Sequence, residues 1–456
     1  MTPSISKGFR AAAMAALAAI VFSPSPLLAK VFSPDSFTLD NGMQVVVVSN
    51  HRAPVVTHMV WYRSGAMDEM PGRTGAAHLL EHLMFKGTEA HPDGVFSQIV
   101  ARNGGRENAF TSQDFTGYFQ SVAADRLELM MELESDRMTN LMMSQEDIDT
   151  EREVVREERR SRIENEPGSR LNEQATAAFF MNHPYGNPVI GWDHEIQALT
   201  REDMMEYYRS WYAPNNAILV VVGDVTMDQV RPLAEKYYGG IPARELPPRI
   251  EWREPPADVA QRITLSDPQV RQPSWSRRYR APGYVYGATE HAYPLEVLAD
   301  ILGGGTTSRI YRSLVVEQKL AAGAGAWYNP TSRGPSSFGF YGAPLPGGEI
   351  GAIEAAIEVE VEKLLRDGVT EEEVQRAIAR LQAEAVYARD SLRAPAQVLG
   401  GGMVIGMSVE EIEAWPERIG AVTAEAVNAA ARAVLAGEAS MTTLLLPETN
   451  SVKGDG

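Results

Sequence analysis

Residues 73–88 read RTGAAHLLEHLMFKGT, and this stretch decides how the first part of the chain folds. The spacing of its apolar residues predicts a helix over residues 76–86. Thr74 can cap the start of this helix and Gly87 its end. Apolar side chains lie on every side of the predicted helix, so we expect it to be buried.

Two of the eight histidines of the chain lie on this helix, four positions apart. His78 and His82 are then one turn apart on one face, with Glu81 beside them. A buried, unpaired carboxylate is costly, so Glu81 needs a partner. A divalent cation supplies one, because two imidazoles at this spacing can both bind it. The alternative is two core histidines hydrogen-bonded to backbone, with Glu81 in a local ion pair; the motif favours the metal site.

A catalytic zinc site usually has three protein ligands, so a third ligand is expected. The segment 144–167, SQEDIDTEREVVREERRSRIENEP, is predicted to form a helix that begins with a capping pair. One stripe of this helix combines acids with apolar residues: Ile148, Glu151, Val155 and Glu158. Either Glu151 or Glu158 can be the third ligand, and the other would then support the site from behind. Both could instead form surface ion pairs, but the shared apolar stripe argues against this.

The composition excludes several classes of function. The chain has 456 residues, 44% hydrophobic and 22% charged, as expected for a soluble protein of two or more domains. Its formal net charge of -18 argues against nucleic acid as a partner. It has no cysteine, which rules out a cysteine nucleophile, a cysteine-type zinc site and disulfides.

The N-terminus is typical of a secretory signal peptide. Lys7 and Arg10 precede a short apolar run, and a small residue, Ala29, ends the segment 1–29. We expect cleavage after Ala29 and a periplasmic or secreted protein. The alternative is an uncleaved anchor, but the apolar run is shorter than a membrane span. No other segment is long and apolar enough to span a membrane.

The rest of the chain is predicted to form two halves. A proline-rich stretch suggests a linker at 246–262, between an N-terminal metal-bearing domain at 30–245 and a C-terminal domain at 263–456 that lacks the histidine motif. Strands and helices mix without strict alternation. We therefore expect an α+β fold with two α/β-sandwich halves, each a mostly antiparallel sheet packed with helices.

Three glycine clusters, at 303–305, 347–348 and 400–402, invite comparison with phosphate-binding loops. None has the lysine or the spacing of such a loop. We expect turns, helix ends or mobile loops at these positions.

His78-Leu79-Leu80-Glu81-His82 resembles the inverted zinc motif of the pitrilysin/insulysin family of zinc metallopeptidases, the inverzincins. This family has its third ligand, a glutamate, at the distance that separates Glu158 from His82. The resemblance therefore selects Glu158 as the ligand and Glu151 as the accessory acid. It implies one Zn²⁺ per chain, held by His78, His82 and Glu158, with Glu81 as the general base.

The resemblance extends over nearly all of the mature chain. Residues 107–119, ENAFTSQDFTGYF, resemble the substrate-binding edge strand of the family, which implies that Asn108 and Ala109 contact the substrate backbone and that Phe110 lines a pocket. From its residue type alone, Phe110 could equally pack in the core. Three further segments resemble the family, the last of them its second, homologous domain: 183–192, 211–225 and 298–314. The size resembles half-length members such as the subunits of mitochondrial processing peptidase.

One departure from the family concerns an arginine and a tyrosine, seven positions apart, that active members carry in the second domain. The matching stretch here, SLVVEQKLAA (313–322), has Val315 and Ala322 at those positions. Neither side chain can donate a hydrogen bond. In heterodimers of the family the zinc motif and this pair can lie on different subunits, so the resemblance implies a homologous partner subunit. The alternative is that the chain acts without a partner and has low activity.

The expected function is a zinc endopeptidase subunit that hydrolyses peptides or unfolded polypeptide segments outside the cytoplasm. The alternative is a non-catalytic assembly subunit, like the respiratory core proteins of the family. Such proteins tend to lose the metal motif, which is complete here. A metal-storage protein would need many ligand clusters, and the sequence has one.

Overall fold

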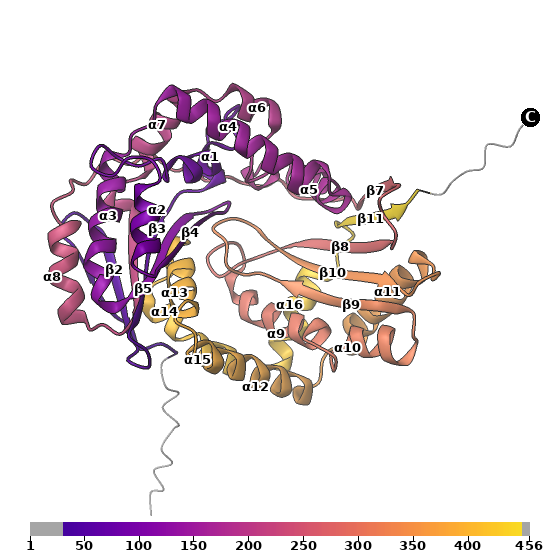
Figure 1. Ribbon diagram of the computed structural model, residues 1–456. Coiled ribbons are helices and arrows are strands. Elements are labelled where there is room, and N and C mark those ends of the chain that lie inside the picture. The colour runs from indigo at the N-terminus through magenta and orange to yellow at the C-terminus, as the bar shows by residue number, and fades with distance from the viewer. Residues whose placement is uncertain (1–30, 449–456) are drawn as a thin grey trace, which may run out of the picture.

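Two sheets, each covered by helices, form the protein (Figure 1). The computed structural model describes residues 31–448. The expected signal peptide, 1–29, lies outside the described residues. Between residues 31 and 448, none of the helices combines the length and the apolar character needed to cross a membrane.

The first sheet has six strands in the order β1-β2-β6-β3-β5-β4, all antiparallel to their neighbours except the parallel pair β2 and β6. The strands are β1 (Asp35–Thr38), β2 (Gln44–Ser49), β3 (Val55–Tyr62), β4 (Arg106–Thr111), β5 (Thr116–Ala123) and β6 (Ala217–Gly223). β4 lies at the edge of the sheet. Its outer backbone groups therefore remain available for an added strand.

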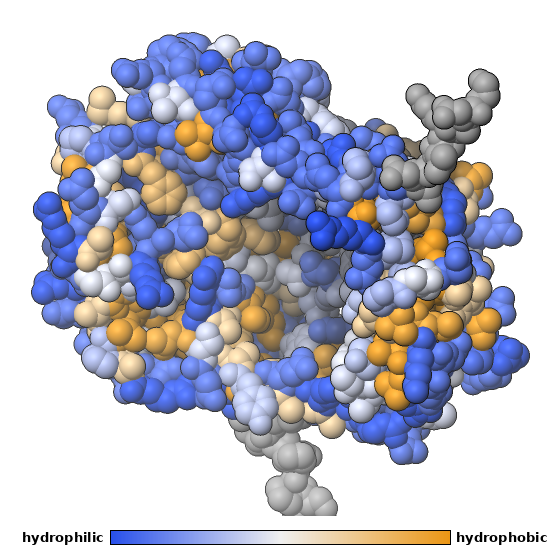
Figure 2. Space-filling model, turned by 45° about the vertical axis from the view of Figure 1, so that its right-hand side comes forward, coloured by the Kyte–Doolittle hydropathy of each residue, from blue (hydrophilic) through white to orange (hydrophobic). Residues whose placement is uncertain are grey.

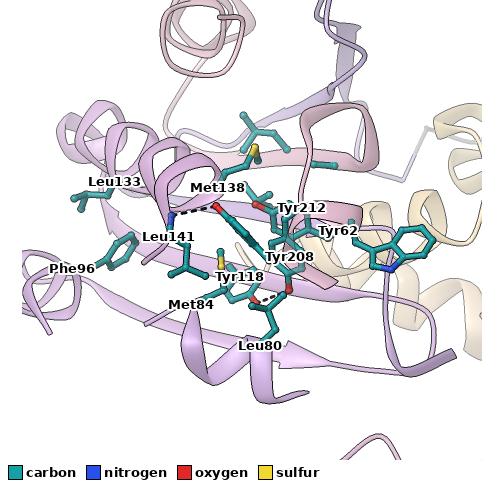
Figure 3. Close-up of a cluster of buried hydrophobic side chains, with 14 of the residues drawn as sticks. Tyr62, Leu80, Met84, Phe96, Tyr118, Leu133, Met138, Leu141, Tyr208 and Tyr212 are labelled. Atoms are coloured by element: carbon teal, nitrogen blue, oxygen red, sulfur yellow. Dashed lines mark hydrogen bonds between the residues drawn. The ribbon is translucent and has the colours of Figure 1, made fainter. Parts of the chain in front are cut away.

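The helices of the first half, apart from α5, cover one face of this sheet and enclose its larger core. The helices are α1 (Ala76–Leu83), α2 (Val95–Arg102), α3 (Leu127–Asn140), α4 (Gln145–Arg159), α5 (Pro167–Phe179), α6 (Asp193–Ala198), α7 (Arg201–Trp211) and α8 (Met227–Tyr237). Tyr118 and Tyr212 lie in this core, with their hydroxyls 2.9 Å apart, and Leu80 of α1 belongs to the same cluster (Figure 3). Since α1 buries its leucines there, its polar side chains lie on its other side.

The second half repeats this topology. Its sheet has the order β7-β11-β8-β10-β9, again with one parallel pair, β7 and β11. The strands are β7 (Gln261–Asp267), β8 (Ser274–Ala281), β9 (Ala321–Tyr328), β10 (Ser336–Pro344) and β11 (Met441–Pro447). Replacing β2, β6, β3, β5 and β4 by these strands in turn gives the same order, so the expected pair of α+β halves with mostly antiparallel sheets is confirmed.

Up to residue 448, where the described part of the chain ends, the second half contains eight α-helices. They are α9 (Ala292–Gly303), α10 (Arg309–Tyr311), α11 (Ile350–Asp367), α12 (Glu371–Ala388), α13 (Ala394–Val404), α14 (Val409–Glu413), α15 (Trp415–Gly420) and α16 (Ala424–Leu435). α9, α11 and α16 pack on one face of the second sheet and bury its core.

The two halves exchange helices, which sequence patterns did not indicate. α13, from the second half, packs on the free face of the first sheet against β3 and β6 (Figure 1). α5, from the first half, packs on the second sheet against β7 and β11. Each half therefore supplies part of the hydrophobic burial of the other, and we expect them to fold together.

An extended segment joins the halves. Residues 242–260 form neither helix nor strand, and β7 takes up the last two residues of the predicted linker, 246–262. The Glu254 carboxylate accepts hydrogen bonds from the backbone amides of Asn182 (3.0 Å) and His183 (2.7 Å) and from the Arg280 guanidinium (2.7 Å). This anchoring fixes the connection between the halves.

The three glycine clusters have different structural roles. Residues 303–305 end α9 and residues 347–348 lie in a turn, as predicted. The prediction of a turn, helix end or loop at 400–402 was wrong, because these glycines lie inside α13. Gly400 faces the ring of Trp61, where a Cβ atom would lie only 2.1 Å from Nε1. A glycine at 400 therefore lets α13 approach the first sheet.

Gly400→Ala is expected to lower the free energy of unfolding by about 1–3 kcal/mol, because the added methyl group forces helix and ring apart. Gly401→Ala is the matched control in the same helix, since a Cβ at Gly401 would meet nothing within 4 Å. It should raise stability by up to about 1 kcal/mol through helix propensity. Urea unfolding of both variants checks this. Equal effects would mean that the contact with Trp61 does not limit the packing.

Candidate metal centre

The helix that carries the histidines begins and ends differently from the prediction. Glu69 holds its start, since this carboxylate accepts hydrogen bonds from the amides of Gly75 (3.1 Å) and Ala77 (2.8 Å). Thr74 does not cap the helix. Its hydroxyl accepts a hydrogen bond from the amide of Trp192 instead. The helix ends at Leu83, before the predicted residue 86, because the chain turns towards the left-handed Gly87.

The second helix of the site, α4, follows the prediction closely. Ser144 and Asp147 form a reciprocal capping box at its start. Ile148 and Val155 are fully buried, and the two acids of the same stripe, Glu151 and Glu158, are half-buried. α4 packs against α1, so this stripe faces the histidines.

Three side chains from these two helices converge on one point. Nε2 of His82 lies 3.3 Å from Oε2 of Glu158, and Nε2 of His78 lies 3.8 Å from the same oxygen. One ligand atom from each of the three residues lies within 4.8 Å of the other two. Tetrahedral zinc ligands, each about 2.0–2.1 Å from the metal, are roughly 3.3 Å apart. The donor set and its spacing therefore fit a zinc ion.

The imidazoles do not have the environment of ordinary core histidines. Neither ring bonds to a backbone group within residues 31–448, and Nδ1 of His78 is buried there without a hydrogen-bond partner. Burial lowers the pKa of His78 to about 4, so this ring is neutral at pH 7. Burial alone would also lower the pKa of His82, but hydrogen bonds to Glu151 and Glu158 raise it to about 9. A divalent cation would replace this extra proton.

Glu151 contacts His82 through Nδ1, the ring nitrogen that does not face Glu158. Its Oε2 lies 3.2 Å from Nδ1 of His82, and its Oε1 pairs with Lys86 at 2.8 Å. The hydrogen bond from His82 lowers the pKa of Glu151 to about 2. A carboxylate in this position holds the proton on Nδ1 and so leaves Nε2 free to bind a metal.

Glu151→Gln is expected to weaken zinc binding by about 10–100-fold, because the amide aligns the His82 ring less strongly. Competition with a chromophoric chelator would measure the change. Glu153→Gln on the exposed side of α4 is the control. Equal zinc affinity of the two variants would contradict a supporting role for Glu151.

Glu81 lies beside the three converging side chains but is not one of them. Its Oε2 accepts a hydrogen bond of 2.5 Å from the hydroxyl of Thr111, at the end of the edge strand β4. Burial raises the pKa of Glu81. The arrangement leaves this carboxylate between the histidines and the edge strand, where it can exchange a proton.

The residues of the edge strand lie on both faces of the sheet. Ala109 packs towards the same core as α1, and its amide donates to the side chain of Asn108 (2.9 Å). The Phe110 ring packs edge-on against Trp61, with centroids 4.9 Å apart. Phe110 therefore packs in the core, which was the alternative to a pocket residue. All three residues also line the cavity of about 540 Å³ that contains the histidines.

Five residues that line this cavity were not predicted as site residues from the sequence: Phe85, Lys86, Asp93, Thr111 and Arg162. Arg162 pairs with Oε1 of Glu158 and so orients the carboxylate. Its position four residues after Glu158 was an available signal. Thr111 could have been found from strand alternation, which places it on the face of Ala109. Val315 and Ala322 are not among the residues that line the cavity.

Comparisons with known proteins show the family to which both halves belong. Residues 44–193 match the family described as Insulinase (Peptidase family M16), and residues 198–381 match the Peptidase M16 inactive domain. The chain is 31% identical to the zinc protease PqqE of Helicobacter pylori over 355 residues, which is 77% of this chain and 79% of that protein.

Solved structures show the same architecture. The structure of a protease from Helicobacter pylori has a TM-score of 0.84 and 28% identity, and the match covers 91% of this chain and 99% of the other. The periplasmic protease PqqL of Escherichia coli has a TM-score of 0.79 at 20% identity, which shows a shared fold. That match covers 92% of this chain but 48% of PqqL.

Proposed function

Since the chain belongs to the M16 insulinase family of peptidases, we propose that it is a zinc-dependent endopeptidase subunit acting on peptides or unfolded polypeptide segments. The observation that carries the proposal is the convergence of His78, His82 and Glu158 beside Glu81, at a free sheet edge. A bound zinc ion supplies Lewis acidity, which polarises a carbonyl and lowers the pKa of water.

The side chains around the metal centre have different roles. His78, His82 and Glu158 hold one Zn²⁺ per chain, and Glu151 and Arg162 orient two of these ligands. Glu81 accepts a proton from the attacking water and gives it to the leaving amine. Its raised pKa suits this role, because a carboxyl group with a pKa nearer neutrality exchanges protons in both directions more readily.

β4 binds the substrate by strand addition. Its outer backbone groups hydrogen-bond to an extended peptide, which fits any sequence, while alternate side chains enter neighbouring pockets. Asn108 and Ala109 contact the substrate backbone, and the Asn108 side chain gives up its bond to the Ala109 amide when a peptide binds. Phe110 shapes a pocket on the other face of the strand. The hollow between the halves, visible in Figure 2, leaves room for such a segment.

The test is cleavage of an unstructured, fluorescence-quenched peptide by the full chain. Zinc-loaded protein should cleave it, chelator-treated protein should not, and added zinc should restore the activity. A zinc-loaded protein that cleaves nothing, alone or with its partner, favours the alternative of a non-catalytic assembly subunit. The valine and alanine at positions 315 and 322 are the observation that keeps this alternative open.

A homologous partner subunit completes the site by supplying the arginine and tyrosine that this chain lacks at 315 and 322. Addition of the partner is expected to raise the cleavage rate by about 10²–10³-fold, because hydrogen-bond donors to the developing oxyanion have effects of this size. A partner variant without that pair should bind equally well, by size-exclusion chromatography, without raising the rate. Full activity of the chain alone would contradict this requirement.

The protein acts in the periplasm or is secreted, after removal of residues 1–29. N-terminal sequencing of the exported protein should find Lys30 first. Retention of the first 29 residues in a membrane fraction would indicate an uncleaved anchor instead.

A further inference from the structure

Glu296 on α9 is a partly buried carboxyl group that the proposed reaction does not use. Its Oε2 accepts hydrogen bonds from the hydroxyl of Tyr284 (2.6 Å) and from Nε1 of Trp415 (3.2 Å). No residue from 31 to 448 donates a hydrogen bond to its other oxygen, Oε1, and none forms an ion pair with Glu296. Burial raises the pKa of Glu296 to about 7. An acid that is largely removed from water and has no counter-ion needs a physical reason to be retained.

This carboxyl group lies at a cavity of about 510 Å³, which is the size of a small-molecule site. Helices α12, α13 and α15 and the segment 31–32 form its walls. Most of the lining is apolar, including Leu381, Val398, Met407, Ile412 and Trp415. Gly401 opens the wall further, because a Cβ atom there would meet nothing within 4 Å.

The charged side chains that line the cavity are all acidic. Glu296 is a partly buried acid, and Glu384 is an exposed acid of the same lining. The described lining contains no lysine, arginine or histidine. An anion would be repelled there, and a neutral apolar molecule would leave the Glu296 carboxylate without a partner.

We propose that this cavity binds a ligand with an apolar body that ends in a primary ammonium group. The body would replace water along the apolar walls, and the ammonium group would donate to Oε1 of Glu296. This chemistry has two sources: a free alkyl or aryl amine, or the N-terminus of a peptide whose first residue is apolar.

Isothermal titration calorimetry of the full chain with hexylamine, hexan-1-ol and hexanoate tests the proposal without any peptidase activity. Hexylamine should bind about tenfold or more tightly than hexan-1-ol, and hexanoate should not bind detectably. Comparison of Leu-Gly-Gly with its N-acetylated form distinguishes the sources, because only a peptide site would bind the free tripeptide more tightly than hexylamine. Equal binding of the amine and the alcohol would overturn the proposal.

Two variants locate the binding. Glu296→Gln keeps an acceptor for Tyr284 and Trp415 but removes the charge, and should weaken hexylamine binding about tenfold or more. Gly401→Leu leaves Glu296 unchanged and fills the cavity, so it should abolish binding even if Glu296→Gln fails to fold. Glu362→Gln, an exposed charge on α11, is the control for net charge and should bind as the parent protein does. Unchanged binding by Gly401→Leu would place the amine elsewhere and refute the assignment.

Discussion

Replacement of Glu81 by glutamine is expected to lower kcat by about 10²–10⁴-fold while the protein keeps its zinc. Glutamine can still accept the hydrogen bond of Thr111 and fills the same space, but it cannot accept a proton. Glu81 is not one of the three converging ligands, so metal content should stay at one equivalent. Peptide cleavage and elemental analysis of the same preparation measure both quantities.

The matched control is Glu153→Gln, which removes one exposed carboxylate from α4. It should leave kcat and zinc content unchanged. Cleavage by the Glu81 variant at the parental rate would exclude Glu81 as the general base. Loss of zinc from that variant would instead make Glu81 part of the metal site and contradict the assignment of roles.

His82→Ala is expected to reduce bound zinc from one equivalent to near zero after dialysis, and to abolish cleavage with it. His82 is central to the cluster, since its two nitrogens face Glu151 and Glu158 at 3.2 and 3.3 Å. Loss of a direct ligand should weaken binding by more than the roughly 10–100-fold expected for the supporting Glu151.

His194→Ala is the control for loss of an imidazole, because the His194 side chain is 80% exposed and lies outside the cluster. It should retain one equivalent of zinc. If His82→Ala also retained one equivalent, the metal would be held by other residues. Glu158→Gln should behave like His82→Ala, which would distinguish it from Glu151→Gln and so decide between the two acids of α4.

Local patterns carried much of the prediction. The histidine spacing placed both rings on one face of α1, and the stripe on α4 gave Glu151 and Glu158 as the inward-facing acids. These patterns work because they depend on helical periodicity alone. These patterns did not decide which of the two acids is the third ligand. The resemblance selected Glu158, and in the structure the Glu158 carboxylate lies beside both imidazoles.

The details that failed depend on contacts that helical periodicity does not record. Glu69, across a loop, holds the start of α1 in place of Thr74, and Trp192 binds the Thr74 hydroxyl. The glycines at 400–402 looked like a turn because helix interiors disfavour glycine. At Gly400 the reason is Trp61, more than three hundred residues earlier, and at Gly402 it is Ile412.

The sequence by itself determined the two halves and the helix that carries His78, Glu81 and His82 on neighbouring positions, since apolar spacing and residue type act over a few turns. Only the tertiary structure decided that α5 and α13 cross between the halves and that the Thr111 hydroxyl at the end of β4 reaches Glu81 on α1. It also revealed Glu296 in an apolar cavity. Such contacts arise when distant segments are packed together to exclude water, and no short stretch of sequence records which segments will meet.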